Sequence, residues 1–413
     1  MKNGNYGLLG EKLGHSFSPR THKMIGELTG SPYTYELYEK APSEVGAFVK
    51  SGDWEGLNVT IPYKQTVMEY CDELSDAARR IGAVNTLVRR DGKIIGYNTD
   101  YIGFKRSLEL AGVSASGKKT LVLGTGGASK AVCCALEDMG AEVVLVGRTS
   151  PVNYQNIHEH DDAELIVNTT PVGMYPKTGV APLFPATFPN LEWAVDVIYN
   201  PLRTNFLCQA KRAGLKTLSG LAMLILQAIA TSEHFFDTKI DESVFEKIKS
   251  ELVSEKQNIV LIGMPGVGKT TCGMMLASEL GKEFYDIDKM IVDMTGKEIP
   301  EIFEEGGEDG FREIESQVVS DLSTVTGAVI ACGGGVVTRE ENYYKLAENG
   351  KLVFLNRDIT VLPTDGRPIS QSVPLARLYK ARLPLYRGWC DMELAIDNLS
   401  PEETCETISN FPT

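Results

Sequence analysis

The sequence predicts an α/β protein with more than one parallel sheet. Two glycine-rich segments carry this prediction, LVLGTGGAS at residues 121–129 and NIVLIGMPGVGKTT at residues 258–271. Each segment follows a short apolar run and precedes a helical pattern. A buried strand, a glycine turn and a helix in that order are typical of α/β domains that bind phosphate groups. The chain has 413 residues, which is enough for two or three domains.

The composition is that of an ordinary globular protein, with 43% hydrophobic and 23% charged residues. A formal net charge of -14 argues against a nucleic-acid partner, because phosphate neutralisation needs a basic face. The eight cysteines lack metal-ligand or disulfide spacing, which favours a reducing cytoplasm. The N-terminal segment has no signal-like apolar core, and the longest apolar stretch, residues 221–230, is too short for a bilayer. We therefore expect neither export nor a membrane partner.

The segment GHSFSP, residues 14–19, precedes the first helical pattern. Ser18 is a good N-cap and Pro19 a good first helical residue. The hydroxyls of Ser16 and Ser18 could also hold a carboxylate at this helix N-terminus. Both interpretations stay open on the residues alone.

Three further segments of the first hundred residues carry polar side chains at strand ends. NVTIPYK, residues 58–64, has Lys64 just beyond a strand, where a lysine is usually a surface charge. GAVNT, residues 82–86, opens a strand with Asn85 and Thr86 at its polar tip. GYNTDYIGF, residues 96–104, delivers Asp100 before a helix, where an N-cap is the alternative to a site residue.

The glycine turn after residues 121–123 fits a dinucleotide loop. Gly124, Gly126 and Gly127 would let the pyrophosphate lie over the N-terminus of a helix that begins near Ser129. The next strand, residues 142–146, ends in Gly147, Arg148 and Thr149. An acidic residue there would bind a ribose 2′-hydroxyl, whereas an arginine suits a 2′-phosphate. The sequence therefore favours NADP over NAD, with an incidental surface arginine as the alternative.

The second glycine-rich segment fits the G-x-x-x-x-G-K-[ST] template. Gly263, Gly266, Gly268, Lys269 and Thr270 occupy its defined positions. Backbone N–H groups of such a loop wrap a phosphate, the lysine reaches the outer phosphates and the threonine can bind magnesium. It follows a charged amphipathic stretch, residues 237–257, which we interpret as a helical connector between two halves.

Acidic and basic candidates follow this loop. Asp286 and Asp288 are expected two apart on an extended segment, so that both project to one face, with a turn cap as the alternative. Arg312 lies on a predicted helix among acidic neighbours, where surface ion pairing is the alternative. Residues 331–335, ACGGG, end a strand in glycines that permit close backbone approach to a ligand. That strand end carries no magnesium-binding aspartate, which fits a small-molecule kinase better than a motor ATPase.

Eight motifs of the first half resemble those of shikimate dehydrogenase, in family order. They are GHSFSP, NVTIPYK, GAVNT, NTD, GTGGAS, NTTPVGM, DVIYNPLRTNF and GLAMLILQA. The resemblance implies an α/β substrate domain, residues 1–104 and 219–240, with an inserted Rossmann NADP-binding domain, residues 105–218.

The same resemblance implies a role for individual residues. Ser16 and Ser18 would bind the carboxylate of shikimate, and Lys64 and Asp100 would be the catalytic pair. The residues implied to contact the substrate hydroxyls or to lie near the substrate are Thr60, Asn85, Asp100, Gln227 and Tyr199. The residues implied to bind NADP are Gly124, Thr125, Gly126, Gly127, Ala128, Arg148, Thr149 and Met223.

One stretch departs from the family pattern. Between Thr149 and Ile166 the chain is shorter than in most members, too short for a full parallel crossover. Gly147 also replaces the usual asparagine before the arginine. We therefore expect a reduced helix-strand unit, and both features weaken the prediction of a tight and selective NADP pocket.

The second half resembles shikimate kinase over residues 258–413, through GMPGVGKTT, DID, GFREIE, CGGG, GRP and RLPLY. The resemblance implies a P-loop nucleoside-monophosphate-kinase-like α/β domain after a helical linker at residues 241–257. The residues implied to bind shikimate are Asp288, Arg312, Gly334, Gly335 and Arg382. The residues implied to bind ATP are Gly263, Gly266, Val267, Gly268, Lys269, Thr270, Thr271 and Arg367. Catalysis is implied for Lys269, Asp288 and Arg367, and magnesium binding for Thr270 and Asp286. The lid between Asn356 and Arg367 carries Arg357 as its one further basic residue.

Together the two resemblances imply a bifunctional enzyme of chorismate biosynthesis. It would reduce 3-dehydroshikimate with NADPH and then phosphorylate the shikimate with ATP and Mg²⁺. One alternative is an NAD-using quinate or shikimate dehydrogenase joined to the kinase. Another is that one half is a non-catalytic module that only binds shikimate.

Overall fold

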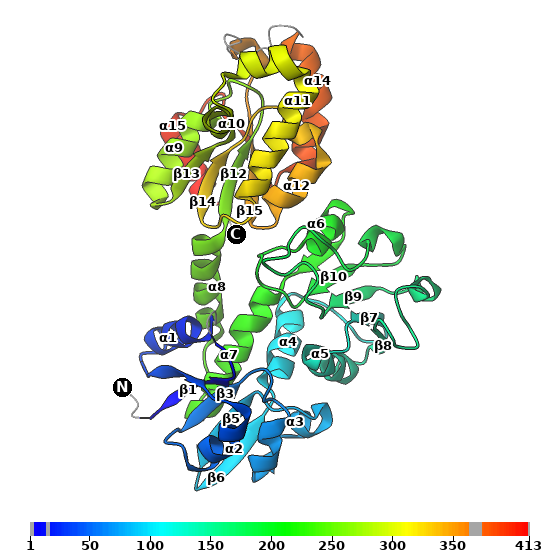
Figure 1. Ribbon diagram of the computed structural model, residues 1–413, viewed down its shortest axis with the longest axis vertical. Coiled ribbons are helices and arrows are strands. Elements are labelled where there is room, and N and C mark those ends of the chain that lie inside the picture. Colours follow the sequence, from blue (N-terminus) through cyan, green and yellow to red (C-terminus); the bar gives the residue numbers. More distant parts are fainter. Residues whose placement is uncertain (1–3, 14–16, 363–373, 412–413) are drawn as a thin grey trace. The chain divides into compact units, whose positions relative to one another are not determined.

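The computed structural model describes residues 4–13, 17–362 and 374–411 (Figure 1). The chain divides into two compact units. The first unit comprises Met1–Val172, Pro182–Tyr199 and Gln209–Glu251, and the second comprises Gly173–Ala181, Asn200–Cys208 and Leu252–Thr413. The predicted connector helix is present as α8, Glu242–Lys256, and the division falls inside it. The domain limits expected from the sequence remain a prediction.

The first sheet of the first unit has the strand order β2-β1-β3-β5-β6-β4. Its strands are β1 Tyr6–Gly10, β2 Tyr35–Glu39, β3 Gly56–Val59, β4 Glu73–Leu74, β5 Thr86–Arg90 and β6 Lys93–Tyr97. Strands β2, β1 and β3 are parallel, whereas β5 pairs antiparallel with both β3 and β6. The helices of this region are α1 Ser18–Leu28, α2 Pro42–Ser51 and α3 Asp76–Ile81, with the 3-10 helix η1 Thr66–Tyr70.

The second sheet of the first unit is entirely parallel, in the order β11-β10-β9-β7-β8. Its strands are β7 Lys119–Leu123, β8 Glu142–Val146, β9 Leu165–Asn168, β10 Trp193–Asp196 and β11 Lys216–Leu218. The helices here are α4 Thr99–Leu110, α5 Gly127–Asp138 and α7 Gly220–Phe236, with η3 at Pro185–Thr187. The division between the units falls inside α6, Asn205–Arg212. Apolar residues of β7, β9, α4 and α5 form one core. The predicted parallel α/β class is therefore confirmed for this part.

The reduced unit expected after Arg148 is confirmed. Between β8 and β9 the chain forms the 3-10 helix η2, Ile157–His160, and an isolated parallel bridge from Val146 to Val152. Strand β8 consequently stays at the edge of its sheet. The region beside Arg148 therefore lacks the full helix that a complete crossover would supply.

The third sheet lies in the second unit and is entirely parallel, in the order β13-β14-β12-β15-β16. Its strands are β12 Asn258–Ile262, β13 Glu283–Asp286, β14 Ala328–Ala331, β15 Gly350–Asn356 and β16 Met392–Ala395. Its helices are α9 Lys269–Leu280, α10 Ile287–Thr295, α11 Ile299–Leu322, α12 Glu340–Ala347, α14 Leu375–Trp389 and α15 Pro401–Ser409, with η4 Val336–Thr338 and η5 Ile359–Val361. Strand β12 is fully buried at the centre, as its continuous apolar run predicts.

Two polar anchors hold the short segments of the second unit. Arg203 forms an ion pair with Asp391 at 2.9 Å. Glu348 accepts a hydrogen bond from the Gly179 N–H at 2.8 Å, and burial raises the pKa of its carboxyl to about 7. Each charged group is thus paired or hydrogen-bonded, as buried charge requires.

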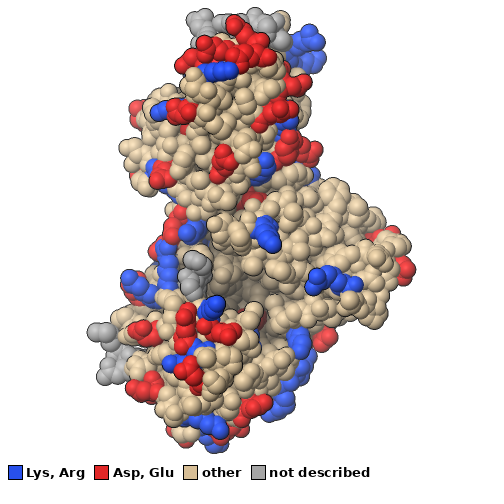
Figure 2. All heavy atoms as spheres, viewed as in Figure 1, with Lys and Arg blue, Asp and Glu red and all other residues tan. Residues whose placement is uncertain are grey.

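Two findings concern the surface. No helix in the described part of the chain is both long and apolar enough to cross a membrane. On the face drawn in Figure 2, lysine and arginine side chains are scattered among acidic ones and do not merge into one basic surface.

Candidate functional site

The start of α1 differs by one residue from the expectation. The N-cap is Phe17, and the Thr21 N–H donates to its carbonyl at 3.0 Å, so the prediction of Ser18 as N-cap is wrong. The helical turn already begins at Phe17, and Ser18 occupies the first turn with its hydroxyl bonded to Tyr35. Ser16 lies outside the described residues, so the carboxylate role of this pair stays a prediction.

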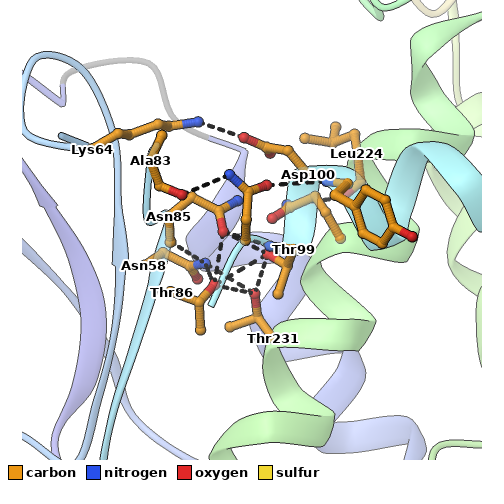
Figure 3. A network of polar contacts seen from close by, with 12 residues as sticks. Asn58, Lys64, Ala83, Asn85, Thr86, Thr99, Asp100, Leu224 and Thr231 are labelled. Carbon is orange, nitrogen blue, oxygen red and sulfur yellow. Dashed lines mark hydrogen bonds and ion pairs between the residues drawn. The ribbon is translucent and has the colours of Figure 1, made fainter. Parts of the chain in front are cut away.

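Lys64 and Asp100 form an ion pair, with Nζ and Oδ2 2.6 Å apart (Figure 3). Their side chains are 29% and 19% exposed. Lys64 is therefore not a freely solvated surface charge. The N-cap of α4 is Asn98, whose side chain accepts the Tyr101 N–H, and Asp100 is therefore not the cap. Its carboxylate in the first helical turn is favoured by the helix dipole and remains available to the lysine.

Helix α4, which carries Asp100, packs closely against α7, which carries the candidate Gln227. A Cβ added at Gly103 would lie 2.7 Å from the Gln227 backbone nitrogen and 2.8 Å from the Met223 carbonyl, so only glycine permits this approach. Gln227 lies half-buried on α7 and donates to the Leu224 carbonyl at 3.0 Å.

Three further substrate-site candidates lie in the described residues of the first unit. Asn85 is buried just before β5, and its Oδ1 accepts the backbone N–H of Thr99 at 2.6 Å. Thr60 follows β3 and donates its backbone N–H to the Leu9 carbonyl. Tyr199 packs edge-on against Phe17, with ring centroids 5.5 Å apart, and burial raises the pKa of its phenol.

The dinucleotide loop after β7 has the open form that a bound pyrophosphate needs. Helix α5 begins at Gly127, two residues earlier than predicted, and its N-cap Gly126 has no capping side chain in the described part of the chain. A Cβ at either glycine would meet nothing within 4 Å. The first backbone N–H groups of α5 are therefore accessible to an anion. Thr125 lies in this loop, and Ala128 lies in the first turn of α5.

The end of β8 explains why an asparagine is absent before Arg148. A Cβ at Gly147 would lie 2.4 Å from the Ser150 hydroxyl and 2.6 Å from the Thr125 methyl, so this position has no room for a side chain. Arg148 and Thr149 are both exposed beside it. An exposed guanidinium at this strand end remains consistent with binding of a 2′-phosphate.

The phosphate loop of the second unit runs from β12 to α9. Lys269 is buried, and its ammonium donates to the carbonyls of Gly263 and Met264 at 3.0 and 2.9 Å. Gly263, Gly266 and Gly268 all have positive φ, which favours glycine. The N-cap Gly268 leaves the first N–H groups of α9 without a capping side chain in the described residues, as a phosphate site requires.

The two aspartates after this loop are not on one extended segment, so that expectation is wrong. Strand β13 ends at Asp286, and Asp288 lies in the first turn of α10. Asp286 caps α10 through the Lys289 N–H and also accepts the Thr270 hydroxyl at 2.6 Å. Capping and the contact to Thr270 therefore coexist, and both aspartates line one cavity.

This cavity unites most kinase candidates with the phosphate loop. Its lining includes Gly266, Gly268, Lys269, Thr270, Thr271, Asp286, Asp288, Arg312, Glu315, Gly333, Gly334, Gly335 and Arg382. Val267, within the loop, is buried. In the described residues no group of three or more His, Cys, Asp or Glu could hold a metal ion, so Thr270 and Asp286 fit magnesium only as a partial, oxygen-donating set. Arg367 lies outside the described residues.

Arg312 pairs with acidic neighbours on its own helix, as one alternative implied, but it is also buried. It is 5% exposed and donates to Glu315 at 2.7 Å and to the exposed Glu308 at 3.3 Å. Burial raises the pKa of the Glu315 carboxyl although Arg312 opposes that shift. Arg312 Nε and Glu315 Oε1 have no hydrogen-bond partner in the described part of the chain. An anionic ligand in the cavity would satisfy the guanidinium.

Glu315 was not among the residues singled out from the sequence. Its position three residues after Arg312 on one helix is the signal that could have found it, since such residues face each other. Arg382, on α14, is also buried and donates to the Gly334 carbonyl at 3.2 Å. The two arginines thus lie at one cavity, although they come from different helices.

The fold and these sites define a class of protein: an α/β enzyme with a dinucleotide-binding half and a phosphate-loop kinase half. Comparisons with known proteins make the class specific. Residues 8–87 match the family model of the shikimate dehydrogenase substrate binding domain, and residues 265–412 match that of shikimate kinase.

Relatives and solved structures agree with the first match. The shikimate dehydrogenase (NADP(+)) of Clostridium perfringens strain 13 is 39% identical over 264 residues, covering 60% of this chain and 97% of that protein. The structure of a chorismate mutase/shikimate 5-dehydrogenase fusion protein from Clostridium acetobutylicum is 41% identical with a TM-score of 0.58, covering 61% and 97%. The Thermus thermophilus enzyme in complex with NADP(H) and shikimate is 33% identical with a TM-score of 0.55, covering 60% and 98%. This chain therefore belongs to the shikimate dehydrogenase family, and its C-terminal part is a shikimate kinase domain.

The close approach of Gly335 to Arg312 gives a testable prediction. A Cβ at Gly335 would lie 1.9 Å from Arg312 Nη2, so Gly335→Ala should force the buried guanidinium aside. Overpacking of this kind costs about 1 to 3 kcal/mol, and we expect a lower thermal unfolding midpoint. Gly310→Ala is the matched control, because a Cβ there meets nothing within 4 Å and alanine favours a helix. Equal midpoints for the two variants would contradict the steric argument.

Proposed function

We propose that this chain carries out two consecutive reactions of chorismate biosynthesis in the cytoplasm. It reduces 3-dehydroshikimate to shikimate with NADPH and phosphorylates shikimate to shikimate 3-phosphate with ATP. The observation that carries the first reaction is the Lys64–Asp100 pair, 2.6 Å apart in a family of NADP-dependent enzymes. The second rests on one cavity that combines the phosphate loop, Asp288 and two arginines. The product of the first site is the substrate of the second.

In the dehydrogenase site, Lys64 would supply the proton. NADPH, when bound, supplies a hydride to the ketone carbon. The ketone oxygen then becomes an alkoxide, which needs both positive potential and a proton at that moment. The Lys64 ammonium meets both needs, and the Asp100 carboxylate orients it from the first turn of α4. Ser18, Thr60, Asn85, Gln227 and Tyr199 would hold the substrate.

In the kinase site, Asp288 would accept the proton of the attacking hydroxyl. ATP with Mg²⁺ supplies the phosphoryl group. Lys269 begins α9 at the end of the phosphate loop and would stabilise the charge of the outer phosphates, together with Arg367. Thr270 and Asp286 would bind the magnesium ion through their side-chain oxygens. Arg312 and Arg382 would clamp the carboxylate of shikimate, which favours guanidinium partners.

Lys64→Ala tests the proposed proton donor. A positioned general acid contributes roughly 100- to 10,000-fold, so we expect NADPH oxidation with 3-dehydroshikimate to fall by at least about 100-fold. Kinase activity of the same chain should be unchanged. Lys93→Ala is the matched control, because Lys93 also pairs with a carboxylate at 2.6 Å but is 59% exposed. A near-normal rate for Lys64→Ala would remove this lysine from the mechanism.

Asp288→Asn separates the two sites. The amide cannot accept the proton of the attacking hydroxyl, so phosphorylation of shikimate should be lost while NADPH oxidation continues. Asp293→Asn, an exposed residue on the same helix, should leave both activities intact. Loss of both activities in Asp288→Asn would refute independent sites.

Arg148→Ala tests the choice of nicotinamide cofactor. The variant should weaken NADPH binding by about 1.5 to 3 kcal/mol, the contribution of a hydrogen bond to a charged group. Binding of NADH, which lacks the 2′-phosphate, should not change, and the NADH affinity of the same variant is the internal control. Equal losses for both cofactors would show that Arg148 does not read the 2′-phosphate.

A single assay tests the whole proposal. The full chain is given 3-dehydroshikimate, NADPH, ATP and magnesium, and NADPH consumption and ADP formation are followed together. ADP should appear only after NADPH is consumed, because the kinase needs the shikimate made by the first site. NADPH consumption without ADP would instead indicate that the kinase half is a non-catalytic module.

A further inference from the structure

A network of buried polar side chains lies next to the Lys64–Asp100 pair (Figure 3). Its centre is three threonine hydroxyls from three elements, Thr86 at the start of β5, Thr99 at the start of α4 and Thr231 on α7. All three residues are 0% exposed, and their hydroxyl oxygens are mutually 3.0 to 3.1 Å apart. Burying hydroxyls is costly unless they are hydrogen-bonded, so each of these groups depends on its neighbours.

The network has a defined direction at its Asn58 end. The Asn58 side-chain nitrogen must face the Asn85 carbonyl at 3.3 Å, because a carbonyl only accepts. The second proton of the same nitrogen goes to the Thr231 hydroxyl at 3.0 Å, which is nearer than the Thr86 hydroxyl at 3.3 Å. Asn58 therefore fills a lone pair of the Thr231 hydroxyl, whose own proton must point to Thr86 or Thr99.

The opposite side of Asn58 supports the same orientation. Its Oδ1 accepts the Tyr35 hydroxyl at 2.7 Å and faces His22 Nε2 at 3.1 Å. Burial lowers the pKa of His22 to about 3, so the imidazole is neutral and carries one proton. Since an amide oxygen only accepts, that proton lies on Nε2 and Nδ1 accepts from the Tyr33 hydroxyl at 2.6 Å.

The onward protons end at Asn85. Its Oδ1 accepts the Thr99 backbone N–H at 2.6 Å and faces the hydroxyls of Thr99 at 3.2 Å and Thr86 at 3.3 Å. A backbone N–H only donates, so this atom is the amide oxygen. The Asn85 Nδ2 group has no hydrogen-bond partner in the described part of the chain. Asn85 can thus offer only N–H donors to a ligand.

Asn85 is connected to both Lys64 and Asp100 through backbone hydrogen bonds of neighbouring residues. The neighbouring Val84 donates its N–H to the Lys64 carbonyl at 2.7 Å. The N–H that binds Asn85 Oδ1 belongs to Thr99, the residue before Asp100. A change in the orientation of the Asn85 amide would therefore alter the surroundings of the proposed proton donor, Lys64.

We propose that Thr231 is a positioning residue of the dehydrogenase site, which acts through Thr86 and Thr99 to orient the Asn85 amide toward substrate. Its hydroxyl accepts from Asn58 and donates to one of the other two threonine hydroxyls, so that their own protons remain directed at Asn85 Oδ1. Without it, the hydroxyls of Thr86 and Thr99 pair with each other and one proton is diverted from Oδ1. This inference rests on the proposed contact of Asn85 with the substrate.

Thr231→Val in the full chain tests the inference, because valine has a similar shape but no hydroxyl. One lost hydrogen bond is about 1 kcal/mol, and a 1.4 kcal/mol change is tenfold in binding, so we expect the KM for 3-dehydroshikimate to rise about five- to tenfold. The KM for NADPH and the kinase rate should not change. Thr231→Ser keeps the hydroxyl and should restore the KM to within about twofold of the original. An unchanged KM in Thr231→Val would overturn the inference.

Thr120→Val is the matched control for burial. Thr120 lies in β7, is 0% exposed and has a hydroxyl without a partner in the described residues. Its substitution should leave both KM values and the thermal midpoint unchanged. If Thr231→Val does not fold, Thr231→Ala is compared with Thr231→Ser, and equal KM values for these two would also overturn the inference.

A double-mutant cycle with Asn85→Ala shows whether Thr231 acts through Asn85. In the Asn85→Ala background, Thr231→Val should add no further rise in KM, because the amide it orients is gone. Additive rises in KM would mean that Thr231 does not act through Asn85. They would overturn this inference but not the proposed function. A normal KM for Asn85→Ala by itself would instead refute the proposed substrate role of Asn85.

Discussion

Parallel strand pairing is the constraint on which both units depend. In the second unit, β12 pairs with β14 and β14 with β13, all in one direction. Their carboxyl ends therefore meet at one edge, where the phosphate loop, Asp286 and the glycines of residues 333–335 come together in one cavity. The parallel second sheet likewise ends β7 in the glycine turn that opens α5. Ligand sites at the carboxyl edge of such sheets are a general consequence of this geometry.

The second recurring feature is how buried polar groups are satisfied. Arg312 and Glu315 are both buried and hydrogen-bonded to each other, and each leaves one buried polar atom without a partner in the described part of the chain. In the first unit, the hydrogen bonds of Asn58 and the threonines run toward Asn85 and leave its amide donors for a ligand. Low polarity around such groups makes an unsatisfied atom costly, so a ligand that completes the set is favoured. The same physics thus prepares both sites, although their folds differ.

Several features could be predicted from local sequence and others could not. The glycine loops and the buried strands before them were recognisable, because apolar runs, glycines and a helical pattern act within about twenty residues. The reduced crossover after Arg148 followed from chain length alone. The start of α1 and the placement of Asp288 were predicted wrongly, because the ends of a strand or helix depend on hydrogen bonds that composition does not specify. Glu315 was missed because its burial comes from packing against other elements.

The sequence by itself determined the α/β class, the two phosphate-binding loops and the family resemblances, since these depend on residue order over short distances. Only the tertiary structure decided between open alternatives. Asp100 is a partner of Lys64 and not a helix cap because Asn98 already caps α4. Arg312 lines a cavity and is buried, although it also pairs with Glu308 and Glu315 on its own helix. Such choices need contacts between segments far apart in the chain, and spacing along a sequence does not contain them.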